Sequence, residues 1–111
     1  MSSEWGVDPI HSILPGSTQY EIIGIHLELY PSDGTEAYLD LVLRRNVERV
    51  VLRFWSPQDL EIERGGPCFT SGFMVYDITA RQMDGLGVRV DDGEGSSGKV
   101  RFCARKVERI R

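Results

Sequence analysis

Three successive segments place an apolar residue at every second position, and this alternation constrains the fold more than any other feature of the chain. In residues 20–30 the odd positions Ile23, Ile25, Leu27 and Leu29 are all apolar. The odd positions of residues 36–44 are again apolar, and the apolar face of residues 47–55 falls on the even-numbered Val50, Leu52 and Phe54. A period of two is typical of a β-strand with one buried face and one wet face. The alternation therefore predicts three half-buried strands.

The first turn between these segments predicts how the first two strands pair. Ser32-Asp33-Gly34 is expected to form a three-residue hairpin loop, with the glycine placed for a left-handed conformation. The expected cross-strand pairs are Leu29 with Ala37, Leu27 with Leu39, and Ile25 with Leu41. The apolar faces then coincide, and a slip of one residue would turn every leucine toward water.

The second turn extends the same arrangement to the third strand. A two-residue loop at Arg45-Asn46 places odd-numbered residues opposite even-numbered ones. The expected pairs are Leu41 with Val50 and Leu39 with Leu52. The three strands should therefore form an antiparallel meander with a single apolar face.

The rest of the chain alternates over shorter stretches. Leu60 and Ile62 indicate a short strand. Residues 69–78 have apolar side chains at both odd and even positions, which indicates a strand that is covered on both faces. Residues 80–85 fit a helical turn or an irregular corner. A third hairpin around the polar loop 91–98 is expected, with Val88 opposite Phe102 and Val90 opposite Val100.

About seven strands joined by short turns predict an all-β fold: an antiparallel two-sheet sandwich or a small barrel, with a meander in the N-terminal half. We expect one β domain over residues 1–111, in which residues 1–18 form an irregular segment that packs across one opening. Apolar residues make 41% and charged residues 27% of the chain, as in ordinary globular domains. The predicted core contains Leu27, Leu39, Leu41, Val50, Leu52, Phe54, Val88 and Phe102.

Charge and hydropathy exclude several classes of protein. The net charge of −4 argues against a general nucleic-acid binder. No stretch approaches the ~18 apolar residues that a membrane helix needs, and no charged and apolar leader resembles a secretory signal. We therefore expect a cytoplasmic protein that binds neither nucleic acid nor membrane.

The charge is unevenly distributed. Residues 99–111 carry a local net charge of +5, which leaves −9 on the preceding residues. One interpretation is that these basic side chains pair with acidic loops of the same protein. The other is a docking stripe for an acidic partner, and the sequence leaves both open.

The search for catalytic and metal-binding residues returns little. Cys68 and Cys103 do not form a disulfide framework and lack metal-ligand spacing. Cys103 is interpreted as a small buried apolar residue; if its sulfur is exposed, the neighbouring Arg101 and Arg105 would favour the thiolate. His26 and Glu28 share the wetter face of the first strand and could form a base with its orienting carboxylate, or a solvent-facing pair. The acidic stretch 91–94 does not match a known calcium loop. We expect no catalytic residue, no metal and no cofactor.

Aromatic and arginine side chains suggest a contact surface. Tyr38, Arg49, Arg53 and Trp55 fall on the face of the second and third strands that lies opposite the leucines. Tryptophan, tyrosine and arginine dominate the energetic centres of protein interfaces. We predict these four residues as a partner-binding surface, unless the protein covers them itself. Replacing Arg53 and Trp55 should then weaken partner binding and leave the unfolding midpoint nearly unchanged.

A series of short motifs in residues 50–104 resembles a pattern found in small bacterial single-domain β proteins. The motifs are Phe54-Trp55-Ser56, Leu60-Glu61-Ile62, Gly72-Phe73, Val75-Tyr76-Asp77-Ile78, Gly85-Leu86, Val88-Arg89-Val90-Asp91-Asp92 and Phe102-Cys103. Some of these proteins are grouped with the immunity proteins of polymorphic toxin systems. The resemblance implies a cytoplasmic protein that binds and blocks a toxin and catalyses nothing. Such families share no catalytic residues that could be transferred to this chain.

The sequence is compatible with three classes of function. The first is a non-enzymatic protein-interaction module of the immunity type, whose partner is another protein. The second is a small-molecule-binding β-barrel or enzyme, with His26 and Glu28 pointing into the barrel mouth. The third is a structural homodimer, in which the outer sheet face is the dimer interface.

Overall fold

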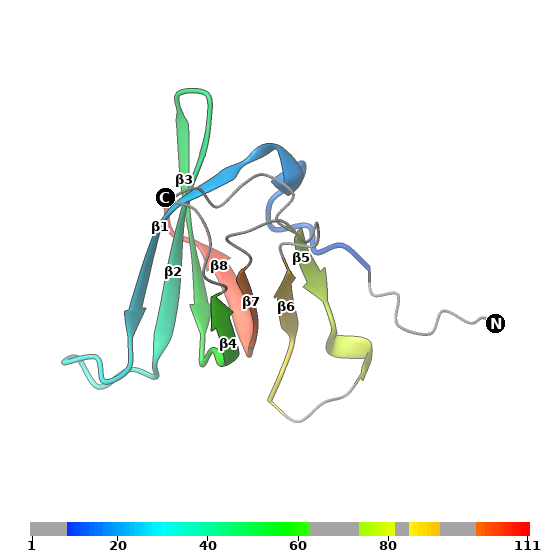
Figure 1. The fold of residues 1–111 in the computed structure, drawn as a ribbon. Helices are drawn as coiled ribbons and strands as arrows, with labels where there is room; N and C mark the ends of the chain where they lie inside the picture. The colour runs from blue at the N-terminus through cyan, green and yellow to red at the C-terminus, as the bar shows by residue number, and fades with distance from the viewer. Residues whose placement is uncertain (1–8, 63–73, 82–84, 92–99) are drawn as a thin grey trace.

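The computed structural model describes residues 9–62, 74–81, 85–91 and 100–111, and these form two four-stranded antiparallel sheets (Figure 1). The first sheet has the strand order β1–β2–β3–β8, with β1 at Glu21–Glu28, β2 at Tyr38–Arg45, β3 at Glu48–Trp55 and β8 at Lys106–Arg109. The second has the order β4–β7–β6–β5, with β4 at Gln58–Ile62, β7 at Val100–Ala104, β6 at Val88–Asp91 and β5 at Met74–Asp77. Two short 3-10 helices are η1 at Ser17–Gln19 and η2 at Thr79–Arg81.

The all-β prediction is confirmed, and of its two alternatives the described residues form the sandwich and no closed barrel. The described part contains eight strands, one more than the roughly seven that turn spacing suggested. The additional strand arises because the last apolar segment is divided between the sheets. Strand β7 belongs to the second sheet, and β8 returns to the first after Arg105.

The predicted pairing of the first hairpin is confirmed over most of its length. Ile25 lies opposite Leu41 and Leu27 opposite Leu39, as expected. The pair of Leu29 with Ala37 falls beyond the ends of both strands. A bulge between Ile22 and Gly24 shifts the register by one residue, so that Ile22, and not Ile23, is buried in the core.

The predicted register of the second hairpin is wrong by two residues. Leu41 lies opposite Leu52 and Leu39 opposite Phe54, because the two-residue loop is 46–47 rather than 45–46. Asn46, with a φ of 57°, adopts the left-handed conformation that asparagine tolerates better than most residues. Because the shift is an even number of residues, every leucine still faces the core.

The third hairpin shows the same two-residue error. Val88 lies opposite Ala104 and Val90 opposite Phe102, instead of the expected Phe102 and Val100. The polar pair of Asp91 with Arg101, assigned in part to the loop by sequence, belongs to the ladder. Residues 92–99 of that loop lie outside the described residues.

The apolar faces of the two sheets pack against each other. Phe54 of β3 and Phe102 of β7 meet edge to face, with ring centroids 4.9 Å apart at an angle of 90°. Seven of the eight predicted core residues are buried, namely Leu39, Leu41, Val50, Leu52, Phe54, Val88 and Phe102. Leu27 is the exception at 39% exposure, because it lies near the end of β1, a strand at the edge of its sheet.

The described part of the N-terminal segment is linked to the second sheet. Ile10 forms a β-bridge with Tyr76, and the backbone of His11 donates to the carbonyl of Val75 at 2.9 Å. Leu14 and Tyr20 are buried in the core with 3% and 2% exposure. The irregular segment expected over residues 1–18 therefore contributes to the core in its described part.

The remaining short elements agree with the expected ones as far as they are described. Strand β4 contains the predicted Leu60 and Ile62. Strand β5 covers the end of the strand expected over residues 69–78, of which residues 69–73 lie outside the described part. The helical turn or irregular corner expected over residues 80–85 begins within η2. Residues 82–84 of this stretch lie outside the described part. No helix among the described residues is long and apolar enough to cross a bilayer.

Replacing Phe54 by alanine should strongly destabilise the protein. Phe54 is fully buried and its ring contacts the ring of Phe102, so truncation leaves a cavity between the sheets. We expect the free energy of unfolding to fall by about 3–5 kcal/mol, measured by chemical denaturation. Val47→Ala, at a loop residue that is 98% exposed, is the control. A Phe54→Ala variant as stable as this control would contradict the observed packing.

A methyl group at Gly87 should also destabilise the protein, for a different reason. Gly87 donates its N–H to the carbonyl of Ala104 at 2.9 Å, and a Cβ there would lie 2.5 Å from the carbonyl oxygen of Arg105. The backbone cannot move away without losing hydrogen bonds between β6 and β7. We expect Gly87→Ala to cost about 1–3 kcal/mol in thermal or chemical unfolding. Gly24→Ala, whose Cβ meets only the Val42 side chain at 3.4 Å, should cost less.

Candidate functional site

The outer face of the first sheet gathers three of the four predicted contact residues, Tyr38, Arg53 and Trp55, in two rows. One row contains Glu28, Tyr38 and Trp55, which are paired across β1, β2 and β3. The next row contains His26, Asp40 and Arg53. The alternation that buries the leucines turns all six of these side chains to the opposite face.

Arg53 is the centre of this surface. Its guanidinium donates two hydrogen bonds to the Asp40 carboxylate, at 2.8 and 2.9 Å. The same group lies over the Tyr38 ring, 3.7 Å from its centroid, and 5.6 Å from the centroid of Trp55. The rings of Tyr38 and Trp55 meet edge to face at 5.6 Å. We refer to Tyr38, Asp40, Arg53 and Trp55 as the aromatic–arginine cluster.

The ion pair within the cluster is partly shielded from water. The Arg53 side chain is 25% exposed and that of Asp40 is 12% exposed. Hydrogen bonding to the carboxylate raises the pKa of Arg53 above its usual value, so its charge is permanent. Removing Arg53 would leave a largely buried carboxylate without its cation, which costs stability. The expectation that Arg53 can be replaced with little change in the unfolding midpoint therefore does not fit this geometry.

Sequence reasoning placed three of the four predicted residues correctly together. Arg49 lies on the same strand as Arg53 but opposite Arg44, toward the other end of β3. Arg44 in turn donates to Glu21 at 2.6 Å. Asp40, which holds Arg53, was missed because the two-residue register error had paired Arg53 with Tyr38. In the correct register Asp40 is the direct neighbour of Arg53, and an aspartate opposite an arginine would have signalled the pair.

His26 and Glu28 lie at the margin of the cluster and not in a barrel mouth. The imidazole Nε2 and the Glu28 carboxylate are 2.9 Å apart, with side chains 62% and 39% exposed. The ring centroids of His26 and Tyr38 are 6.4 Å apart. Because the sheets of the described part do not close into a barrel, the barrel interpretation of this pair is wrong.

A second polar cluster joins the two sheets at one corner. Glu36 accepts two hydrogen bonds from Arg105, at 2.8 and 2.7 Å, and one from the hydroxyl of Ser56 at 2.9 Å. The chain leaves the first sheet at Ser56 and returns to it after Arg105. These bonds lower the pKa of Glu36 below its usual value and raise that of Arg105, with hydrogen bonding as the largest cause in both.

Three arginines near the C-terminus form ion pairs within the protein. Arg105 pairs with Glu36, Arg101 lies 3.8 Å from Glu61, and Arg109 lies 4.0 Å from Glu48. Arg101 and Arg109 lie on strands of different sheets, and Arg105 lies between these strands. The geometry therefore favours the interpretation of internal pairing over that of one continuous docking stripe.

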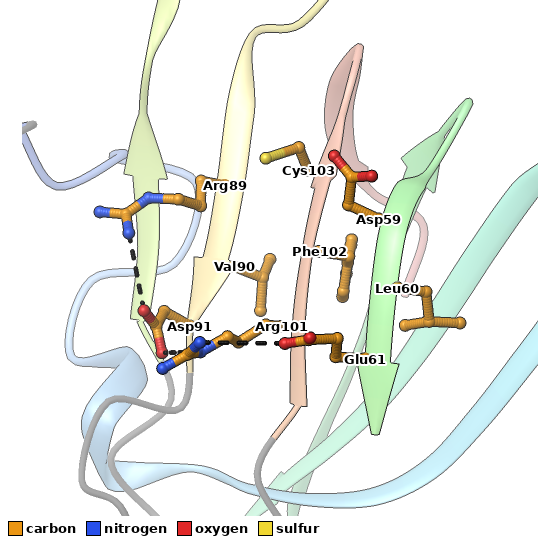
Figure 2. Close-up of a pocket in the computed structure, with 9 residues that line it drawn as sticks. All are labelled: Asp59, Leu60, Glu61, Arg89, Val90, Asp91, Arg101, Phe102 and Cys103. Atoms are coloured by element: carbon orange, nitrogen blue, oxygen red, sulfur yellow. Dashed lines mark ion pairs between the residues drawn. The ribbon is translucent and has the colours of Figure 1, made fainter. Parts of the chain in front are cut away.

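A groove of about 730 Å³ crosses β4, β7 and β6 of the second sheet (Figure 2). Its lining residues are Asp59, Leu60, Glu61, Arg89, Val90, Asp91, Arg101, Phe102 and Cys103. Figure 2 shows Arg101 between the carboxylates of Asp91 and Glu61, at 3.5 and 3.8 Å. Arg89 lies 3.6 Å from Asp91 and stacks over Tyr76, 4.4 Å from the ring centroid.

Cys103 is not the small buried residue that sequence analysis expected. It is partly exposed and lines the groove, because the buried positions of β7 are the even-numbered Val100, Phe102 and Ala104. An odd-numbered residue between them must face outward, so the parity of the strand already contained this information. Cys68 lies outside the described residues.

Among the described residues, no group of three or more histidine, cysteine, aspartate or glutamate side chains could hold a metal ion. Residues 92–94 of the acidic loop are not part of the description. Comparison of the chain with protein-family models, curated proteins and solved structures found no match. The function therefore has to be inferred from the side chains of this chain and their surroundings.

The Glu36 cluster predicts a pH-dependent contribution to stability. A carboxylate whose folded pKa lies below its usual value of 4.5 stabilises the folded state above that value. The contribution disappears as the pH falls through the lowered folded pKa. Glu36→Gln should therefore lower the free energy of unfolding near pH 7, and the difference from wild type should shrink toward pH 3. A difference that stays constant in denaturation curves across this range would argue against the cluster.

Proposed function

We propose that the chain is a non-enzymatic protein-interaction module that binds its partner through the aromatic–arginine cluster. Its most specific form is an immunity-type inhibitor, which binds and blocks a toxin in the bacterial cytoplasm. The observation that carries the proposal is the stacking of Arg53 on Tyr38, with Arg53 held by the Asp40 carboxylate. Arginine and tyrosine are enriched at the energetic centres of interfaces.

The cluster is organised before any partner arrives. Two hydrogen bonds and a ring contact hold the Arg53 guanidinium, and Trp55 supports Tyr38 edge to face. Ordering a long side chain on binding costs about 0.5–1.5 kcal/mol, and here much of that cost is met during folding. A surface of this kind presents aromatic area to a partner with little loss of conformational entropy.

The charge of the cluster bears on the choice of partner. Because Asp40 neutralises Arg53, the cluster has no free positive charge with which to select an acidic partner. The residues before position 99 carry a net charge of −9, which would attract a basic protein over long range. Toxins that act on nucleic acid are commonly basic, so we favour a basic partner. The cluster then determines how the partner is oriented. The negative charge of the residues before position 99 raises the rate at which the partner is encountered.

The groove of the second sheet favours a small-molecule function less strongly. Its volume of about 730 Å³ lies within the range of ligand pockets. Its charged side chains, however, are engaged with one another: Arg101 lies within 4.0 Å of both Asp91 and Glu61. Ligand pockets are lined mainly by apolar and aromatic groups, with few polar ones. A ligand here would have to displace ion pairs, so we rank this function second.

Two matched variants test the proposal. Tyr38→Ala removes the ring under Arg53 on the first sheet, and Tyr76→Ala removes the ring under Arg89 on the second. The probe is a neighbouring gene product that inhibits growth when it is expressed alone; it is co-expressed with each variant and titrated by calorimetry. Tyr38→Ala should weaken binding by about 2 kcal/mol and abolish growth protection, whereas Tyr76→Ala should do neither.

The stability of both variants is measured alongside binding, because each loses a cation–π contact of similar size. Equal weakening by the two variants would assign the effect to folding rather than contact. Loss of binding only with Tyr76→Ala would indicate that the partner contacts the second sheet and not the aromatic–arginine cluster. Full binding by Tyr38→Ala would overturn the assignment of the cluster.

A further inference from the structure

Among the strands that the structure describes, β1 is an outer strand of the first sheet and has β2 as its one neighbour there (Figure 1). The backbone groups on its other side therefore face no other described strand of this sheet. Edge strands usually carry protection against pairing with another chain, such as a bulge, a lysine or a proline. The N-terminal half of β1 has such a bulge between Ile22 and Gly24.

The C-terminal half of β1 lacks these protections. Residues 25–29 read Ile-His-Leu-Glu-Leu and pair regularly with β2 as far as Glu28. Leu27 is 39% exposed and Leu29 is 58% exposed. The opposite edge of the sheet differs, because β8 carries the charged residues Lys106, Glu108 and Arg109. The apolar, regular edge of the first sheet is thus confined to the end of β1.

We propose that this edge pairs with the same edge of a second copy of the chain, antiparallel, around a two-fold axis at Leu27. In this register Leu27 lies opposite its own copy. Each His26 lies opposite a Glu28 of the other copy, and each Ile25 lies beside a Leu29. The outer face of the new strand pair then joins imidazoles to carboxylates, and its inner face joins apolar side chains to one another.

The neighbouring registers are worse for identifiable reasons. An axis at His26 places the two imidazoles opposite each other and Glu28 opposite Gly24. An axis at Glu28 places the two carboxylates opposite each other, and like charges in that position are destabilising. An axis at Ile25 places Glu28 opposite Ile22, where the bulge interrupts the ladder. The register at Leu27 alone among these joins histidine to glutamate twice.

The existing contact within β1 is compatible with the pairing. His26 and Glu28 already lie 2.9 Å apart on the outer face. In the dimer each carboxylate lies between the imidazole of its own strand and that of the other copy. This inference does not depend on the proposed function, although it would place two aromatic–arginine clusters on one continuous sheet face, since His26 lies 6.4 Å from Tyr38.

A disulfide tests the register. In a background with Cys68→Ser and Cys103→Ser, the two-fold places both copies of Leu27→Cys directly opposite each other, within the Cα separation that a disulfide spans. Mild oxidation should therefore give a covalent dimer. His26→Cys and Glu28→Cys, whose own copies are two positions away along the strand, should remain monomeric. Efficient cross-linking from either control, with none from Leu27→Cys, would overturn the register.

A charge exchange tests the interaction without oxidation. Light scattering over a dilution series should show a concentration-dependent dimer for the wild type. Glu28→Lys should weaken it about tenfold, since both symmetric pairs lose the carboxylate that lies opposite the imidazole. The double variant His26→Glu with Glu28→Lys should restore dimerisation. A wild type that stays monomeric at every concentration, without a Leu27→Cys cross-link, would overturn the proposal, whatever its binding to a toxin.

Discussion

The edge-to-face contact between Phe54 and Phe102 joins the two sheets, and the position of the aromatic–arginine cluster follows from the same strand. Phe54 points inward from β3, so its neighbours Arg53 and Trp55 must point outward from the same strand. The register that sets Phe54 opposite Leu39 also sets Arg53 opposite Asp40. The packing of the core and the ion pair of the surface are thus two consequences of one strand alignment.

The alternation in the sequence determines which face each residue occupies, but not which residue it meets. Leu41 and Leu52 were both assigned correctly to the core, and yet Leu41 was paired with Val50. A shift of two residues leaves the apolar faces in contact, so hydrophobicity alone does not distinguish the two registers. The choice depends on the conformation of Asn46 and on the ion pair between Arg45 and Glu48, at 2.9 Å.

The candidate sites differ in how far they could be predicted. Tyr38, Arg53 and Trp55 lie on consecutive strands of a meander, so their proximity follows from parity and a short loop. The groove on the second sheet requires β4 to lie beside β7, strands that are distant in the sequence. No local pattern indicates that pairing. The exposure of Leu27 does not follow from alternation either, because alternation does not indicate that Leu27 lies near the end of an edge strand.

The period of two along the hairpin strands has a consequence for how the length of such a chain can change in evolution. In a hairpin with one apolar face, an insertion or deletion of two residues within a strand keeps the same side chains facing the core. An indel of one residue reverses every side chain beyond it, unless a bulge like that at Ile22 absorbs it. Length variation in the hairpins should therefore be predominantly even. Even steps would carry Arg53 past Asp40 to a new neighbour while the leucines stay buried, so the surface pairs would change while the fold is retained.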